Sequence, residues 1–174
     1  LKNNKGTEDN RVRKLDYSIQ LSKLFYERFI NDEDITLFSP HEVPELYEAW
    51  GTEAFDDLYI KTERKTSITK KKVSAQTLFM DMLKERAETG RIYIMNIDHC
   101  NSHSSFKDRI YMSNLCQEIT LPTDPIQHID GKGEIALCIL SAINVGKISY
   151  LEDLENLCDL AVRALDEIID HQKY

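Results

Sequence analysis

The chain has 174 residues, enough for one domain with a sizeable core, and its 41% hydrophobic and 30% charged residues are typical of a globular protein. This composition excludes a disordered chain, a collagen-like repeat and a small disulfide scaffold, and no apolar run approaches the roughly 20 residues of a membrane span. The net charge of −8 argues against binding nucleic acid through its phosphates.

The first half of the chain is predicted to be mainly helical. Apolar side chains recur at helical spacing from Leu15 to Ile30, with lysine, arginine and glutamate between them. Ser39, Pro40 and Glu42 form a helix start, because serine can cap, proline fits the first turn and glutamate completes a capping box. We expect helices over residues 15–30, 43–50, 55–60 and 74–88, a strand over 35–38, and a solvated basic helix face over 61–72.

The second half changes to apolar runs of strand length separated by polar loops. Residues 135–140 are almost continuously apolar, which is typical of a strand buried on both faces. Ser149 and Glu152 form a capping box before a long amphipathic helix. We expect strands over 91–95, 117–121 and 135–140, polar loops over 96–109 and 123–133, and a final helix from about 150 to about 171 whose apolar side faces inward.

This alternation of helices and short strands predicts an α/β fold. The sequence contains no internal repeat, low-complexity tract or Pro/Gly-rich linker, so we treat residues 1–174 as one segment. Its predicted parts are a helical region over 1–90, a strand and loop region over 91–148, and a C-terminal helix over 149–172. Because the first residue is Leu1 rather than Met, we expect an internal piece of a longer protein.

The first candidate site is the cluster Asp98-His99-Cys100-Asn101-Ser102-His103. It contains zinc ligand types, and His99 and His103 share a face if the segment is helical. However, no second Cys/His pair follows at zinc-finger spacing, and Asn101-Ser102 favours a loop. We therefore prefer a polar loop to a metal site here.

The second candidate site combines Asn114, Cys116 and Glu118. If this segment is extended, the three side chains lie on one face. A thiol, a carboxylate and an amide in one row can support nucleophilic or radical chemistry, with cysteine reactive, glutamate as base and asparagine as a hydrogen-bonding group. The spacing supports such a site and an edge strand with an incidental cysteine about equally.

The other three cysteines are predicted from their pattern alone to be structural. Cys138 lies within the apolar run over 135–140, and Cys158 lies on the apolar side of the final helix. Cys100 lies in the polar cluster over 98–103 and in no apolar run or cysteine pair, so we also expect it to be structural. Because the sequence carries no secretion signal, we expect a reducing, cytoplasmic compartment with free thiols.

Several ordered motifs resemble the large (α) subunit of class I ribonucleotide reductase, and the bacterial aerobic type most closely. The resemblance covers essentially the whole chain, although the family's subunit is much longer. It implies a ten-stranded α/β barrel with a finger loop inside, to which this chain contributes some strands. The motifs are Asn114-Leu115-Cys116-Gln117-Glu118, Gly133-Glu134-Ile135-Ala136-Leu137-Cys138, and the stretches 1–17, 34–41, 85–103 and 161–166.

The resemblance implies roles for four residues. Cys116 matches the cysteine at the tip of the finger loop, where a transient thiyl radical forms and abstracts the 3′ hydrogen of the ribose. Glu118 matches the carboxylate that takes the 3′-hydroxyl proton, and Asn114 matches the amide that hydrogen-bonds the substrate. Cys138 matches one of two cysteines that deliver electrons and become a disulfide, which replaces its purely structural interpretation. A buried finger tip suits Cys116, since a thiyl radical needs shielding.

The resemblance also implies partners for a parent protein. These are a radical- and metal-bearing small (β) subunit, thioredoxin or glutaredoxin, a ribonucleoside diphosphate substrate, the effectors ATP, dATP and other dNTPs, and a second large subunit in a homodimer. It implies no cofactor and no metal within this segment. The second redox cysteine, the radical-relaying tyrosines and the tail cysteines lie outside residues 1–174, so we expect the segment alone to be inactive.

Two alternatives stay open at this point. The chain can be non-catalytic, either one piece of a split subunit or an interaction module whose amphipathic helices dock on partners, and exposed strand edges then predict self-association. It can also be a stand-alone thiol enzyme that uses Cys116 with Glu118. Against this, no basic residue lies near Cys116 in the sequence to lower its pKa.

Overall fold

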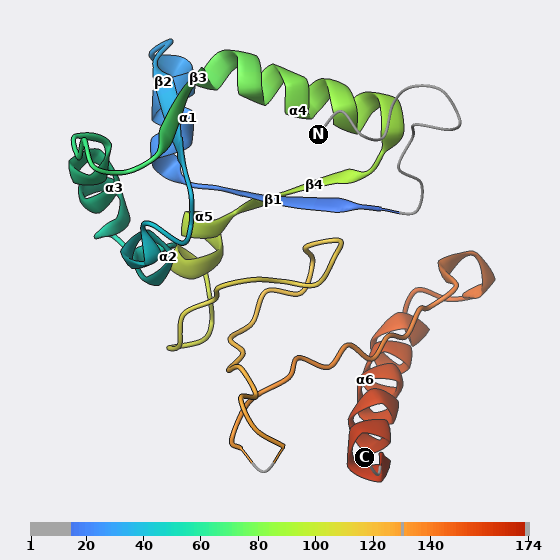
Figure 1. The fold of residues 1–174 in the computed structure, drawn as a ribbon. Coiled ribbons are helices and arrows are strands. Elements are labelled where there is room, and N and C mark those ends of the chain that lie inside the picture. Colours follow the sequence, from blue (N-terminus) through green and yellow to red (C-terminus); the bar gives the residue numbers. More distant parts are fainter. Residues whose placement is uncertain (1–14, 130, 173–174) are drawn as a thin grey trace. The chain divides into compact units, whose positions relative to one another are not determined.

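A computed structural model of the chain describes residues 15–129 and 131–172 (Figure 1). They fall into two compact units, one ending at Ile135 and the other beginning at Ala136. Among these residues, the paired strands make two two-stranded sheets and no closed barrel, and no helix has the length and apolar content of a membrane span. The helices and strands of the first unit are β1 (Tyr17–Leu21), α1 (Lys23–Ile30), β2 (Asp34–Phe38), α2 (Pro44–Ala49), α3 (Phe55–Glu63), β3 (Lys70–Ser74), α4 (Ala75–Thr89), β4 (Ile92–Asn96) and α5 (Ile97–Ser102).

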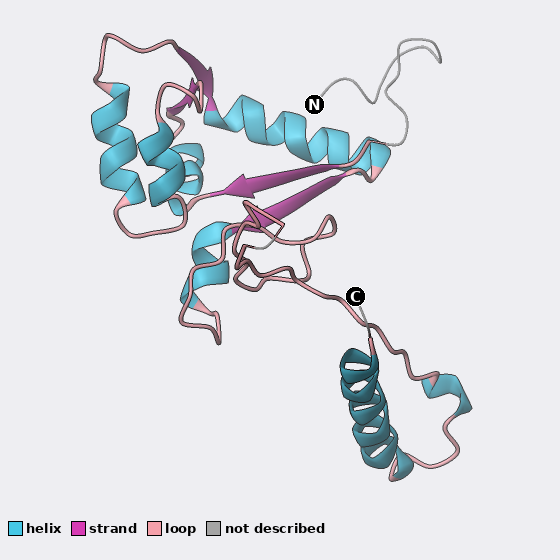
Figure 2. Cartoon of the chain, turned by 60° about the horizontal axis from the view of Figure 1, so that its bottom comes forward, coloured by secondary structure: helices cyan, strands magenta, loops and turns pink. Residues whose placement is uncertain are grey.

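Strands β1 and β4 pair in parallel (Figure 2). In this register Ser18 lies opposite Tyr93. The prediction of one helix over 15–30 is therefore wrong, because residues 17–21 are a strand and the helix begins after them. The run Tyr-Ser-Ile-Gln-Leu has the strand period of two, which a coincident helical spacing of apolar residues obscured. Ser22 separates the two elements and caps α1 by accepting a hydrogen bond from the third residue on.

Strands β2 and β3 form an antiparallel pair, which confirms the strand predicted over 35–38. Strand β3 is unexpected, since the basic run over 61–72 was predicted as a helix face and instead supplies exposed lysines to this sheet. The main core joins β1, β2 and helices α1 to α4, and burying each of its larger apolar side chains contributes about 1.5–3 kcal/mol. Its buried members are Leu21, Leu24, Phe25, Ile35, Val43, Leu46, Phe55, Tyr59, Ala75 and Met82.

Helix α4 confirms the helix predicted over 74–88. The Ser74 side chain caps its start by accepting from the Thr77 N–H at 3.2 Å. Gly90 ends it in the left-handed conformation, with φ of +66°. The predicted strand over 91–95 follows directly and is confirmed as β4, and helix α3 likewise confirms the helix expected after α2.

Helix α2 confirms the helix predicted over 43–50, but not the start signal predicted for it. Its first turn contains Pro44, and its N-cap residue, Val43, makes no capping bond from its side chain. The capping box predicted from Ser39 and Glu42 does not form at this helix start. Instead, the Glu42 carboxylate accepts hydrogen bonds from the backbone and hydroxyl of Thr69, both at 3.3 Å, and so ties the segment to the connection before β3.

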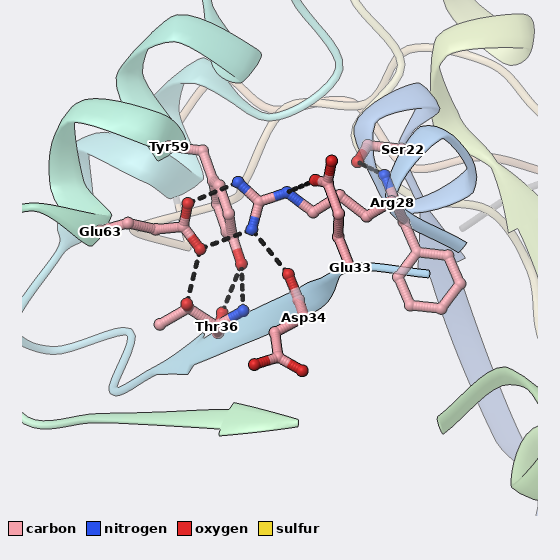
Figure 3. Close-up of polar contacts among 8 residues, drawn as sticks. Ser22, Arg28, Glu33, Asp34, Thr36, Tyr59 and Glu63 are labelled. Atoms are coloured by element: carbon pink, nitrogen blue, oxygen red, sulfur yellow. Dashed lines mark hydrogen bonds and ion pairs between the residues drawn. The ribbon is translucent and has the colours of Figure 1, made fainter. Parts of the chain in front are cut away.

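A partly buried ion pair joins α1 to α3 (Figure 3). Arg28 donates two hydrogen bonds to Glu63, at 2.7 and 2.5 Å, and one to the Asp34 carbonyl at 2.8 Å. Thr36 donates to the same carboxylate at 2.5 Å, and its backbone exchanges hydrogen bonds with the Tyr59 hydroxyl. Burial raises the pKa of Glu63, but the bonds from Arg28 and Thr36 outweigh it and hold this pKa below 4.5.

Two predicted strands are absent from the described structure. Residues 117–121 and 135–140 form no strand, and regular pairing in this part is one antiparallel bridge between Asp124 and Glu134. Apolar side chains of the second run are exposed, Leu140 by 79%. A strand buried on both faces needs neighbouring strands and covering helices, which the described residues do not place around it.

The second unit contains helix α6 (Asp153–His171), preceded by the short 3-10 turn η2 (Val145–Lys147). The predicted final helix is confirmed, but it starts later. Glu152 is its N-cap and makes no side-chain capping bond, so the box predicted from Ser149 does not form. No residue of α6 is buried, so its apolar side does not face inward as predicted.

Candidate active site

The residues of the second candidate site lie in a tight turn. The Gln117 N–H donates to the Asn114 carbonyl at 3.2 Å, and the Ile119 N–H donates to the Asn114 side-chain oxygen at 3.0 Å. Ser113 adds a hydroxyl hydrogen bond to the same carbonyl at 2.9 Å. Gln117 has φ of +67°, a left-handed conformation that costs a residue with a side chain about 1–2 kcal/mol. Asn114 thus organises the turn that Cys116 occupies.

This geometry corrects the predicted row of side chains. The chain turns at Leu115 and Cys116, and Gln117 follows in the left-handed conformation, so the alternation of an extended strand does not apply. Asn114, Cys116 and Glu118 still lie close together, because they lie in or directly after one turn. The Asn114 side-chain oxygen is engaged by the backbone, so its NH2 group is the part suited to donate to a ligand.

Cys116 and Glu118 are exposed, whereas Asn114 is half-buried. The buried finger tip implied by the resemblance is therefore not formed among the described residues. A radical is shielded by side chains packed around it on several sides, and one turn cannot supply such walls. What the turn does supply is a thiol, a carboxylate and an amide donor within one local structure.

Tyr93 of β4 is a contact of Cys116 that the sequence analysis missed. A hydrogen bond between its hydroxyl and the Cys116 thiol, together with the charge of the thiolate, raises the pKa of Tyr93. The predicted strand could have indicated which way Tyr93 points. Tyr93 alternates with Ile92 and Ile94 along the strand and therefore points to the opposite face. Strand β4 thus places a phenol beside the candidate reactive group.

The chain leading to the turn is anchored by α5. Asn101 donates to the Ile110 carbonyl at 3.0 Å and accepts from the Ile110 N–H at 2.9 Å. The neighbouring Arg109 donates to the Glu48 carbonyl at 2.6 Å, and its guanidinium lies 4.0 Å from the centre of the Tyr111 ring. The loop expected over 96–109 therefore contains a helix whose asparagine fixes the start of the site segment.

The first candidate site, around His99, is also helical rather than a loop. The His99 and His103 rings lie 5.7 Å apart, and the Asp98 carboxylate accepts from the Lys23 N–H at 2.5 Å, at the start of α1. Among residues 15–129 and 131–172, no group of three or more His, Cys, Asp or Glu side chains is arranged to hold a metal ion. Asp98 therefore has a structural partner at a helix N-terminus.

Comparison with known proteins gives the family. The whole chain, residues 1–174, matches the family model described as "Ribonucleotide reductase, barrel domain". The chain belongs to this family. It is 54% identical to the ribonucleoside-diphosphate reductase subunit alpha of Buchnera aphidicola subsp. Schizaphis graminum and 56% identical to that of Haemophilus influenzae, each over all of the chain and 24% of the relative.

A third relative is the ribonucleoside-diphosphate reductase 1 subunit alpha of Escherichia coli K12, which is 55% identical over 72% of the chain and 17% of the relative. The chain thus spans about a quarter of the length of the first two curated relatives.

The remaining cysteines of this ribonucleotide reductase segment are free thiols. Cys138 and Cys158 belong to the second unit and are exposed, which corrects the prediction that their apolar surroundings bury them. Cys100 is half-buried on α5, and burial raises the pKa of its thiol. Of the four predicted catalytic residues, three share the turn and Cys138 lies in the other unit.

Proposed function

We propose that the parent protein reduces ribonucleoside diphosphates to deoxyribonucleoside diphosphates, and that these 174 residues carry part of its catalytic centre. The observation that carries the proposal is the match of the whole chain to reductase alpha subunits, with Asn114, Cys116 and Glu118 in one turn. On this proposal the turn is the finger loop of a ten-stranded barrel that the rest of the parent completes.

In the proposed reaction a thiyl radical on Cys116 abstracts the 3′ hydrogen of the ribose. Glu118 takes the 3′-hydroxyl proton, which helps to expel the 2′-hydroxyl as water. Asn114 donates a hydrogen bond to the substrate near these hydroxyls. Cys138 and a second cysteine elsewhere in the parent provide two electrons and two protons as they become a disulfide, and Cys116 regains its hydrogen from the 3′ position.

The proposed parent works with other components. A small subunit bearing a metal and a radical generates the Cys116 radical, and thioredoxin or glutaredoxin returns the disulfide to two thiols. ATP, dATP and other dNTPs act as effectors of a homodimeric large subunit in the cytoplasm. We place the sites for these components outside this segment, which by itself is proposed to be inactive.

The test replaces Cys116 in the full-length parent with serine and measures deoxyribonucleotide formation with the small subunit present. Serine keeps the size of the side chain but not the S–H bond, so we expect turnover to be abolished while substrate still binds. Cys158→Ser is the matched control and is expected to retain turnover. Wild-type turnover in Cys116→Ser contradicts the proposed function.

The exposed apolar side of α6 favours a second candidate, a non-catalytic interaction segment. Leu157 and Ile168, on the apolar side of this helix, are 38% and 46% exposed. If the native polypeptide ends at these 174 residues, gel filtration of the chain alone should show self-association or a complex with partner chains. A monodisperse monomer argues against this alternative.

A further inference from the structure

The two faces of β1 contact different parts of the first unit. Leu21 is buried in the main core and Ile19 packs against it. Ser18 and Gln20 alternate with them and therefore point to the opposite face, where both side chains hydrogen-bond the segment that leads to Cys116. One strand thus connects the hydrophobic core to the candidate catalytic turn.

Ser18 holds the peptide group next to Cys116. Its hydroxyl donates to the Leu115 carbonyl at 3.0 Å, across 97 positions of sequence. That carbonyl belongs to the planar peptide unit that also contains the Cys116 nitrogen. A hydrogen bond to its oxygen therefore restrains the orientation of this peptide unit, and with it the position of the Cys116 Cα. The Ser18 hydroxyl therefore restrains the peptide bond that directly precedes the reactive cysteine.

Gln20 holds the other end of the same segment. Its NH2 group donates to the Tyr111 carbonyl at 2.9 Å. Its oxygen accepts from the Trp50 indole N–H at 2.5 Å. Indole nitrogen can only donate, so Trp50 must face the amide oxygen and this turns the NH2 group toward Tyr111. Trp50 therefore selects the orientation of Gln20 that binds the segment.

Strand β4 places the thiol on the same face. Tyr93 is opposite Ser18 in the parallel register, so the two side chains lie on one side of the strand pair. Tyr93 lies beside the Cys116 thiol, and this interaction raises the pKa of Tyr93. Ser18 and Tyr93, neighbours on the two paired strands, thus both interact with the segment around Cys116.

We propose that Ser18 and Gln20 are positioning residues of the reductase, which fix the segment from Tyr111 to Leu115 on β1 and so set the place of the Cys116 thiol. The inference rests on the proposed function. Neither residue touches substrate on this proposal, and both act through the backbone of the catalytic turn. Misplacing a reacting atom by about 1 Å can lower a rate by up to 100-fold, so loss of one anchor is expected to appear in kcat.

The test uses the full-length parent subunit with its small subunit and CDP as substrate. We expect Ser18→Ala to lower kcat about tenfold and to leave KM for CDP unchanged, because binding groups are not altered. Ser18→Thr keeps the hydroxyl and is expected to restore kcat. Gln20→Leu, which keeps the size but loses both hydrogen bonds, is expected to lower kcat in the same way.

The matched control is Ser67→Ala, the same chemical change at an exposed position between α3 and β3, and it is expected to leave kcat unchanged. An unaltered kcat in Ser18→Ala overturns the inference. So does a loss that Ser18→Thr shares or that is accompanied by a higher KM, because either result indicates a general disturbance of the fold.

Cys116→Ser, measured in parallel, separates this inference from the proposed function. If Cys116→Ser retains turnover, the proposed function fails and the positioning role fails with it. If Cys116→Ser is inactive while Ser18→Ala and Gln20→Leu have wild-type kcat, only the positioning role is overturned.

Discussion

Helices α4 and α6 are both long and amphipathic, yet only α4 has buried residues. Helix α4 lies in the first unit and buries Ala75, Met82 and Glu85. Helix α6, in the second unit, buries no residue and leaves Leu157 and Ile168 exposed on its apolar side. An amphipathic pattern therefore predicts which face of a helix will be covered, but the covering surface can lie in residues that are not in the chain.

The largest expected difference between the two units is in amide hydrogen exchange of the 174-residue chain. Helix α4 and strand β4 contribute to the first unit's packed core, so their central amides are expected to exchange at least about 1,000-fold more slowly than unfolded peptide. Most of the stability of a helix in a protein comes from packing of its apolar face, and α6 buries no residue, so its amides are expected to exchange within about tenfold of the unfolded rate. Equal protection of α4 and α6, measured by mass spectrometry, contradicts the comparison.

A matched pair of arginine substitutions tests the same comparison of the two units. Arg28 and Glu63 are 12% and 15% exposed in the first unit, whereas Arg163 and Asp159 on α6 are 74% and 55% exposed. Arg28→Ala leaves a buried carboxylate without its partner and is expected to lower the free energy of unfolding by about 3 kcal/mol. Arg163→Ala, the control, is expected to change it by less than about 0.5 kcal/mol, since exposed pairs contribute little.

Urea unfolding followed by circular dichroism measures both values. A cost for Arg28→Ala as small as that for Arg163→Ala contradicts a structural role of the buried pair.

The smallest predicted effect is in the acid range. The folded-state pKa of Glu63 is lowered below 4.5, so its contribution to stability is present above about pH 4.5 and is lost as the pH falls through the folded-state pKa. The stability difference between wild type and Glu63→Gln is therefore expected to shrink as the pH is lowered from 5 to 3. Glu167→Gln on α6, where the partner His171 is 83% exposed, is the control and is expected to show no such change. A constant difference for Glu63→Gln contradicts the assignment.

Local signals predicted the helices and strands that have their partners nearby. Ser74 and Gly90 mark both ends of α4, and the strand after it follows at once. The strand over 17–21 was missed because its apolar residues also fit a helix, and its partner β4 lies more than seventy residues away. The strands predicted over 117–121 and 135–140 do not form, because a strand needs neighbouring strands to pair with and the described residues place none beside these segments.

The family was predictable from the sequence, and the geometry of the candidate site was not. The motif around Cys116 led to the family that the comparisons show, whereas the catalytic roles of Asn114 and Glu118 stay predictions. The spacing alone predicted an extended segment with the three side chains on one face. The residue types do not indicate that Gln117 adopts a left-handed conformation. Ser18, Gln20 and Tyr93 could not be connected to Cys116 without the register of β1 and β4, which is a long-range property.

The two anchors on β1 have a consequence for the length of the segment they hold. Ser18 and Gln20 are two residues apart on a strand, a separation of about 6.8 Å, while their targets, Leu115 and Tyr111, are four residues apart and would span about 13 Å if extended. The segment between the two anchored carbonyls is thus longer than the spacing of its anchors, in keeping with its lack of strand structure. We expect a residue inserted between Tyr111 and Leu115 to be taken up within this segment while both anchors stay in place.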